Sequence, residues 1–115
     1  MQYLLLIYGN EKAMLSAPKE AAGQMLAAYT AYTEAMKKAG VYIGGNRLQP
    51  TSTATTVRVN DGKNNVVDGP YAETKEQLAG YYLIEAPDVD AALAWAARCP
   101  GAARGALEVR PVWQM

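Results

Sequence analysis

The pattern of hydrophobic and polar positions divides the chain into short apolar runs and one long helical stretch. Residues 3–8 form a continuous apolar run that ends at Gly9-Asn10, which is typical of a strand buried on both faces. Residues 19–39 place apolar side chains at steps of three and four, which predicts an amphipathic helix ended by Gly40. The apolar stripe of this helix should comprise Ala22, Met25, Tyr29, Tyr32 and Met36.

Strand patterns dominate the middle of the chain. Residues 41–48 predict a strand with a bulge or a close approach of another group at Gly44-Gly45. Residues 53–59 are rich in β-branched side chains and residues 65–68 run back, so we expect a hairpin around the turn at 60–63. Polar connections are expected at 11–17 and 49–52, and residues 72–78 fit either a helical turn or an extended loop.

A second strongly apolar strand is predicted over residues 80–85, and a second helix follows it. Asp88 is a natural N-cap for that helix, and residues 99–101 should stop it. Leu107 and Val109 alternate with charged residues, which predicts a last strand. The core side of the second helix should carry Val89, Ala92, Leu93 and Ala96, with Trp95 at its flank.

The predicted order is β-α-β, a β-hairpin, and again β-α-β. This order is typical of the ferredoxin-like α+β fold, a βαββαβ arrangement, with the hairpin inserted before the third main strand. Right-handed crossovers would place both helices on one face of the sheet. At 115 residues, the chain should form one domain over residues 1–115.

The first strand is apolar on both of its faces, although the helices would cover only one. Leaving several large side chains of the other face in water would cost several kcal/mol at ~25 cal/mol per Å². We therefore expect a homodimer in which two sheets pack face to face as a dimeric α/β barrel. A hairpin folded over the face, or a well-filled face, would be the monomeric alternative.

Composition removes several classes of function. Eleven basic and eleven acidic residues give a formal net charge of zero, so direct binding to nucleic acid or to anionic membranes is not expected. The N-terminal residues lack the features of a signal peptide, and the single Cys99 excludes an internal disulfide, so a cytoplasmic location is expected. The absence of histidine excludes His-based triads, and no metal or cofactor motif is present.

Residues 68–85, of sequence DGPYAETKEQLAGYYLIE, resemble the signature of the DGPF domain, a branch of the YCII-related family, with Tyr71 where that family usually has Phe. Residues 3–9, 48–50, 53–59, 94–98 and 108–112 also resemble the family, so the resemblance extends over nearly the whole chain. It implies a ferredoxin-like fold that dimerises into an α/β barrel. It also implies a link to extracytoplasmic-function sigma factors, because many members are encoded beside them. Some YCII-related proteins resemble small enzymes, among them a dehydrochlorinase, and a His-Asp pair has been proposed as catalytic; this chain has no histidine for such a pair.

The charged corner at residues 68–76 is the candidate site. Asp68 either accepts backbone N–H bonds that fix the turn or serves as a general base, and Glu73 is the second candidate acid. Cys99, at the C-terminal end of a helix, should be inert. Candidate ligand-binding residues are Arg58, Tyr71, Lys75 and Tyr29. We expect Arg47 and Arg58 to lie on neighbouring strands, where they could bind an anion; a solvated strand face is the alternative.

Two functions remain after these considerations. The first is a dimeric small-ligand-binding or regulatory module whose partner is a sigma factor or a small organic ligand. The alternative is a small cofactor-free enzyme of lyase or isomerase type, dehydrochlorinase-like, that uses Asp68 or Glu73 for proton transfer. The enzymatic hypothesis expects both carboxylates to converge on a closed, partly apolar pocket.

Overall fold

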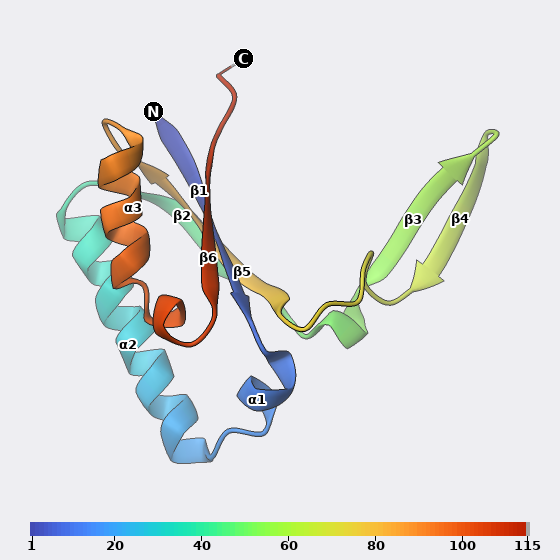
Figure 1. Ribbon diagram of the computed structural model, residues 1–115, viewed down its shortest axis with the longest axis horizontal. Helices are drawn as coiled ribbons and strands as arrows, with labels where there is room; N and C mark the ends of the chain where they lie inside the picture. Colours follow the sequence, from blue (N-terminus) through green and yellow to red (C-terminus); the bar gives the residue numbers. More distant parts are fainter. Residues whose placement is uncertain (115) are drawn as a thin grey trace.

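The structure is a computed structural model that describes residues 1–114 (Figure 1). A four-stranded antiparallel sheet, in the order β2-β5-β1-β6, forms the body of the protein together with helices α2 and α3. A separate two-stranded sheet, β3-β4, projects from the body. The strands are β1 (Gln2–Gly9), β2 (Tyr42–Arg47), β3 (Thr55–Asn60), β4 (Lys63–Asp68), β5 (Gln77–Glu85) and β6 (Ala106–Pro111). The helices are α1 (Glu11–Leu15), α2 (Lys19–Lys38) and α3 (Val89–Arg98), with short 3₁₀ turns η1 (Thr51–Thr53) and η2 (Pro100–Ala103).

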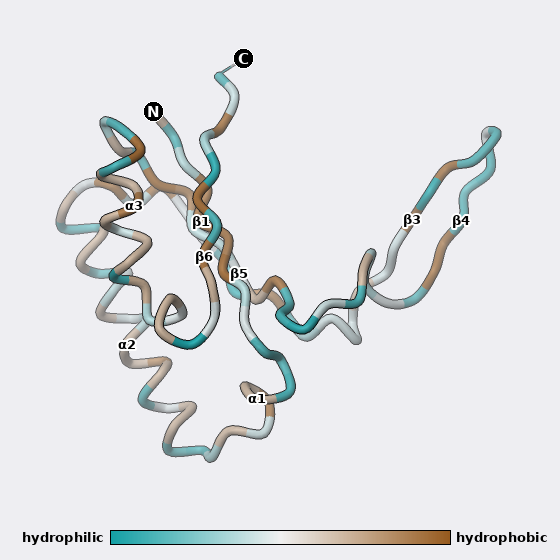
Figure 2. The backbone as a smooth tube through the Cα atoms, in the orientation of Figure 1, coloured by the Kyte–Doolittle hydropathy of each residue, from teal (hydrophilic) through white to brown (hydrophobic). Residues whose placement is uncertain are grey.

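The sheet order is that of a ferredoxin-like α+β fold and confirms the predicted fold class. Strand β1 lies in the centre, where it pairs with β5 on one side and with β6 on the other. Helices α2 and α3 both cover the same face of the sheet, as the crossover rule requires (Figure 1). In Figure 2 the colours mark hydrophobic residues along β1 and β5, which agrees with the position of these strands in the middle of the sheet.

The hydrophobic core lies between the sheet and the two long helices. One alternation of β1 supplies Tyr3, Leu5 and Ile7, and α2 supplies Tyr32 and Met36. Leu5 and Met36 are completely buried. The predicted stripe of α2 is thus confirmed at its C-terminal end. The first turns of α2 extend beyond the sheet, which is why Ala22 is exposed.

Helix α3 approaches the sheet through small side chains. Ala92 and Ala96 are buried one turn apart, so the helix can lie close to the strands. The prediction that Val89 and Leu93 face the core was wrong, because they are 45% and 48% exposed. Leu93 lies on the flank of the alanine line opposite Trp95, which packs against the core.

The structure revises the prediction for one connection and chooses between two alternatives for another. Residues 11–15 form helix α1, where a polar connection was predicted. Asn10 is its N-cap, and its Oδ1 accepts a hydrogen bond from the N–H of Ala13 at 3.0 Å. A five-residue helix is too short to show an apolar period, so its pattern resembled a loop. Residues 69–76 form a loop with bends and no helical turn, and β5 begins at Gln77.

The hairpin β3–β4, residues Thr55–Asp68, is called the arm below. Asp61 and Gly62 have φ angles of 50° and 77°, which is the two-residue turn that suits a twisted hairpin. The arm points away from the body (Figure 1). The radius of gyration is 16.0 Å, whereas about 13 Å is typical of a compact domain of this length. The arm accounts for this extended shape.

Candidate functional site

The arm joins the body through a network built on Glu11, at the first turn of α1. One carboxylate oxygen of Glu11 accepts a hydrogen bond from the N–H of Thr51 at 2.7 Å, and the other accepts one from the Thr51 hydroxyl at 2.6 Å. The N–H of Glu11 donates to Oε1 of Gln77 at 2.9 Å. Thr51 precedes the arm and Gln77 follows it, so Glu11 holds both connections to the arm in place.

The sequence pattern does not predict the anchoring role of Glu11. The residue belongs to no motif, and its partners are 40 and 66 residues away in the chain. An Asn-Glu pair directly after a buried strand was the only local signal, since it matches a capped first turn with an acidic residue.

The corner after the arm is shaped by backbone contacts. Gly69 has a φ of 112°, which L side chains rarely adopt, so a glycine is required there. Its N–H donates to the carbonyl of Ala54 at 2.7 Å, and its carbonyl accepts the Thr56 hydroxyl at 2.9 Å. The Asp68 side chain is exposed, and within residues 1–114 its carboxylate accepts no backbone N–H. The turn is therefore fixed by Gly69 and not, as one interpretation held, by Asp68.

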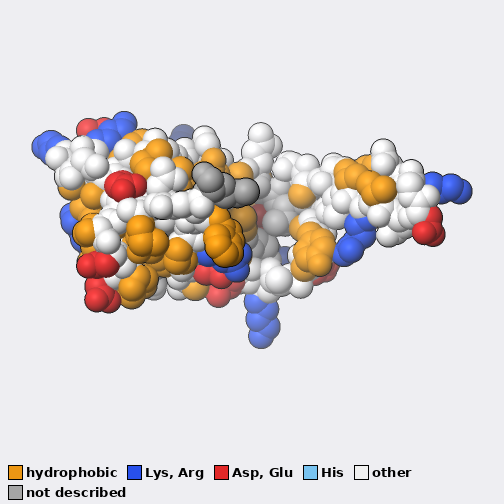
Figure 3. Space-filling model, turned by 90° about the horizontal axis from the view of Figure 1, so that it is seen from above, with side chains coloured by type: hydrophobic (Ala, Val, Ile, Leu, Met, Phe, Trp, Pro, Cys, Tyr) orange, Lys and Arg blue, Asp and Glu red, His pale blue; other side chains and the backbone are white. Residues whose placement is uncertain are grey.

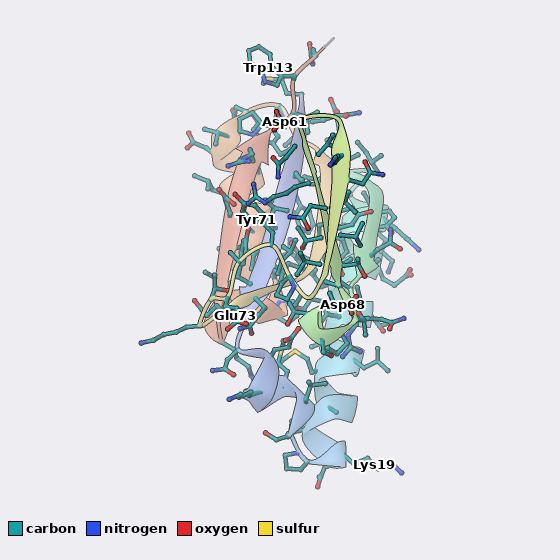
Figure 4. The ribbon with its side chains drawn as sticks, turned by 90° about the vertical axis from the view of Figure 1, so that its right-hand side faces the viewer. Lys19, Asp61, Asp68, Tyr71, Glu73 and Trp113 are labelled. Carbon is teal, nitrogen blue, oxygen red and sulfur yellow. The ribbon has the colours of Figure 1, made fainter. Side chains whose placement is uncertain are left out.

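The predicted site residues of the corner lie around one loop. Figure 4 places Asp68 and Glu73 on opposite sides of this loop and Tyr71 between them. The guanidinium of Arg58, on β3, lies 5.0 Å from the centre of the Tyr71 ring. Asp68, Glu73 and Lys75 are exposed, and Tyr71 is 75% exposed. Within one chain, therefore, the two candidate acids do not converge on a closed pocket.

Two predicted ligand-binding residues are separated from this corner. Tyr29 lies on α2, with its hydroxyl 4.0 Å from Sγ of Cys99. Arg47 belongs to β2 in the main sheet and Arg58 to the arm, so the prediction that they lie on neighbouring strands was wrong. The two arginines were expected on neighbouring strands because β2 and β3 follow each other in sequence. In the structure, β2 pairs with β5.

Tyr29 belongs to a polar cluster between the helices and the sheet. The hydroxyls of Thr33 and Tyr82 are 2.9 Å apart, and Tyr32 donates to the Trp95 carbonyl at 2.7 Å. Burial raises the pKa of the Tyr82 hydroxyl. Burial likewise raises the pKa values of Tyr29, Tyr32 and Cys99. These groups therefore remain protonated near neutral pH, and the Cys99 thiol is a poor nucleophile, as expected from the sequence.

The face of the sheet opposite the helices carries large apolar side chains. The register pairs Leu4 with Leu83 and Leu6 with Tyr81, so these four side chains share that face. All four are only partly buried. Asn46 of β2 donates to the Tyr81 hydroxyl at 2.9 Å and places a polar group at one edge. Helices α2 and α3 lie on the other side of the sheet, so no helix of residues 1–114 covers this open face (Figure 1).

Paired glycines in β2 allow a close approach to the neighbouring strand. The register shifts between Tyr42 and Gly44, as the predicted bulge requires. A Cβ atom on Gly45 would lie 2.7 Å from Cδ1 of Tyr82 and 2.8 Å from the carbonyl oxygen of Tyr81. Gly45 is therefore needed for packing in the sheet, and the pair gives no sign of a phosphate-binding loop.

Comparison with known proteins identifies the family. The chain matches the family described as the YCII-related domain over residues 1–115. The chain belongs to the YCII-related family. It is 38% identical over 114 residues to the uncharacterized protein R00369 of Rhizobium meliloti (strain 1021), which covers 97% of this chain and 92% of that protein.

The residues of this YCII-related protein limit the ligands that one copy can hold. It contains no histidine, and among residues 1–114 no group of three Cys, Asp or Glu residues is placed to hold a metal ion. No helix in that range is long and apolar enough to span a membrane. Two open hollows lie on the surface of the same residues, one along α2 and one beside the C-terminal segment, and neither is lined by Asp68, Tyr71 or Glu73.

Proposed function

We propose that this YCII-related protein is a dimeric small-ligand-binding or regulatory module. The dimer forms through the open faces of two sheets, and Leu4, Leu6, Tyr81 and Leu83 lie in its interface. The ligand binds at the corner that carries Asp68, Tyr71 and Arg58. This arrangement corresponds to a dimeric α/β barrel.

The observation that carries the proposal is the exposed surface of the single chain. The chain exposes 8223 Å². A compact monomer of 12.4 kDa would expose about 6,100 Å². The excess of about 2,100 Å² is within the range of roughly 1,000–2,500 Å² that each subunit buries in an obligate homodimer. The arm and the open face both contribute exposed surface, and a second copy is the simplest cover for the open face.

The corner supports the ligand-binding half of the proposal. Arg58 and Tyr71 are stacked and largely exposed, with carboxylates at Asp68 and Glu73 on either side. A guanidinium over an aromatic ring offers both charge and a flat apolar surface, which suits a small organic acid or a phenolic compound. The link to a sigma factor rests on the family resemblance alone.

Sedimentation equilibrium at micromolar concentration tests the dimer. We expect the mass of two chains for the parent and of one chain for Leu6→Lys. Lysine is chosen because Leu6 lies opposite Glu108, which can accept the new charge in the monomer. A matched control is Leu26→Lys, since Leu26 is 65% exposed on α2, remote from the open face. A parent protein that sediments as a monomer would refute the dimer.

A thermal-shift screen of small organic acids and phenolic compounds tests the ligand site. A true ligand should raise Tm of the parent and have at least a tenfold weaker effect on Arg58→Gln or Asp68→Asn. Glu34→Gln, which changes an exposed carboxylate on α2, is the control. A ligand that stabilises all variants equally binds elsewhere and would contradict the site.

A further inference from the structure

We infer that the arm is a clasp for a second copy of this chain: the arm of each copy packs its apolar face on the body of the other copy. This inference rests on the proposed dimer, and adds that the arm holds the dimer together and that the ligand corner lies at the boundary between copies.

The first argument is that one apolar face of the arm stays exposed in the part of the chain that the structure describes. Paired residues share a face, so the register places Val57, Val59 and Val66 on one face of the hairpin. These side chains are 58%, 63% and 58% exposed. An isolated two-stranded hairpin is marginally stable in water. The arm therefore needs a cover, and exposed valines at three of six positions on one face would otherwise be costly.

The second argument is that the arm is held firmly in its projecting position. Glu11 bonds Thr51 on one side of the arm and Gln77 on the other. A further backbone bond links Gly69 to Ala54 across the base. A disordered surface loop would not need these bonds. Anchoring at the base suits an element that must present its valine face in one direction.

The third argument concerns the kind of partner. Between Thr55 and Asp68 the arm has two basic residues, Arg58 and Lys63, and two acidic residues, Asp61 and Asp68. Its charge sums to zero, as does that of the whole chain, so neither a polyanion nor a strongly charged protein is favoured. A second copy satisfies these conditions because its surface is also neutral and the proposed sheet-to-sheet dimer already brings it next to the arm.

The shape fits this partner. Seen from above, the arm stands apart from the body, and hydrophobic side chains appear on the surface of both (Figure 3). Six-residue strands span about 20 Å, so the arm is long enough to reach across a dimer interface onto the body of the other copy. Two-fold symmetry makes the contact self-complementary, so each copy gives one arm and receives one.

The clasp places the corner at the boundary between two molecules. The Arg58–Tyr71 stack lies on the face of the hairpin opposite the three valines, since residues 57 and 58 point to opposite sides. Asp68 ends the arm on the valine face, opposite Thr55. The single chain leaves both sides of the corner open, and residues of the second copy complete the site.

The experiment compares the dimer dissociation constant of arm and control variants by sedimentation. Val57→Lys/Val66→Lys should weaken the dimer at least tenfold, while Leu26→Lys should leave it within twofold. Val57→Thr/Val66→Thr keeps the β-branched shape and should weaken the dimer less than the lysine variant does. This threonine variant replaces the lysine variant in the comparison if the lysines unfold the hairpin.

Hydrogen exchange provides a second measurement. Amides of β3 and β4 should be protected in the parent dimer and lose that protection at least tenfold in Leu6→Lys, or on dilution of the parent if that variant does not fold.

The outcomes separate the two proposals. A parent dimer whose affinity is unchanged by both arm variants, and whose arm amides exchange as fast as those of an unfolded chain, refutes the clasp and leaves the sheet-to-sheet dimer standing. A parent that stays monomeric at about 100 μM, roughly 100-fold above a dissociation constant of 1 μM, refutes both.

Discussion

Replacing Glu11 by alanine tests whether one carboxylate fixes the arm on the body. The substitution removes the acceptors at 2.7 and 2.6 Å from the Thr51 amide and hydroxyl. A hydrogen bond to a charged group contributes roughly 1.5–3 kcal/mol, and this site is only partly buried, so the freed amide regains some water. We expect the free energy of unfolding to fall by about 2 kcal/mol, which corresponds to roughly 8 °C in Tm for a chain of this size.

Urea denaturation measures this loss, and three variants make the result specific. Glu11→Gln keeps one good acceptor and should lose about 1 kcal/mol. Glu34→Ala removes an exposed carboxylate whose ion pair with Lys37 spans 3.8 Å, and it should change the stability by less than ~0.5 kcal/mol. In Glu11→Ala, the amide of Thr51 should also exchange faster with solvent. The anchoring role is wrong if Glu11→Ala and Glu34→Ala unfold at the same urea concentration.

Three further predictions concern the core. Met36→Ala should lower the free energy of unfolding by about 2–5 kcal/mol, because Met36 is completely buried; a urea midpoint shift worth less than ~1 kcal/mol would contradict the packing described. Cys99 should react with Ellman's reagent at pH 8 only after denaturant is added, since it is 2% exposed and burial raises the pKa of its thiol; complete reaction of the folded protein within a minute would show that the helix end is open. Burial also raises the pKa values of Tyr29, Tyr32 and Tyr82, so the folded state holds protons that the unfolded state releases above the usual tyrosine pKa of 10.0. The stabilising contribution of these hydroxyls is therefore complete below pH 10 and declines as the pH rises above it. Thermal unfolding measured from pH 8 to pH 11 should show a falling Tm. A Tm that stays level through pH 11 would contradict this reasoning.

The sequence predicts the body of the fold well because its signals are local and redundant. The apolar run of β1, the stripe of α2 and the Asp88 cap each specify an element without reference to the rest of the chain. Asp88 does accept the predicted bond, from the N–H of Ala91 at 2.9 Å. The ferredoxin-like order follows from these elements and from the handedness of crossovers.

The sequence predicts the candidate site less well because its geometry depends on contacts between distant segments. Arg58 and Tyr71 meet across 13 residues, and nothing in their local patterns indicates it. The expectation that Arg47 and Arg58 lie on neighbouring strands came from strands that follow each other in sequence. Instead the hairpin leaves the sheet at η1, where Glu11 holds it. The roles of Asp68 and Glu73 stay predictions, since a single chain leaves both in solvent.

The central place of β1 in the sheet determines when its edges are paired during synthesis. Tyr3 pairs with Ile84 on one side and with Pro111 on the other, so both neighbours of β1 are made long after it. Until residue 84 has emerged from the ribosome, the most apolar strand of the chain has no partner, and one edge stays unpaired until residue 111 is made. Nascent chains that stall before β6 has emerged should therefore aggregate or bind chaperones.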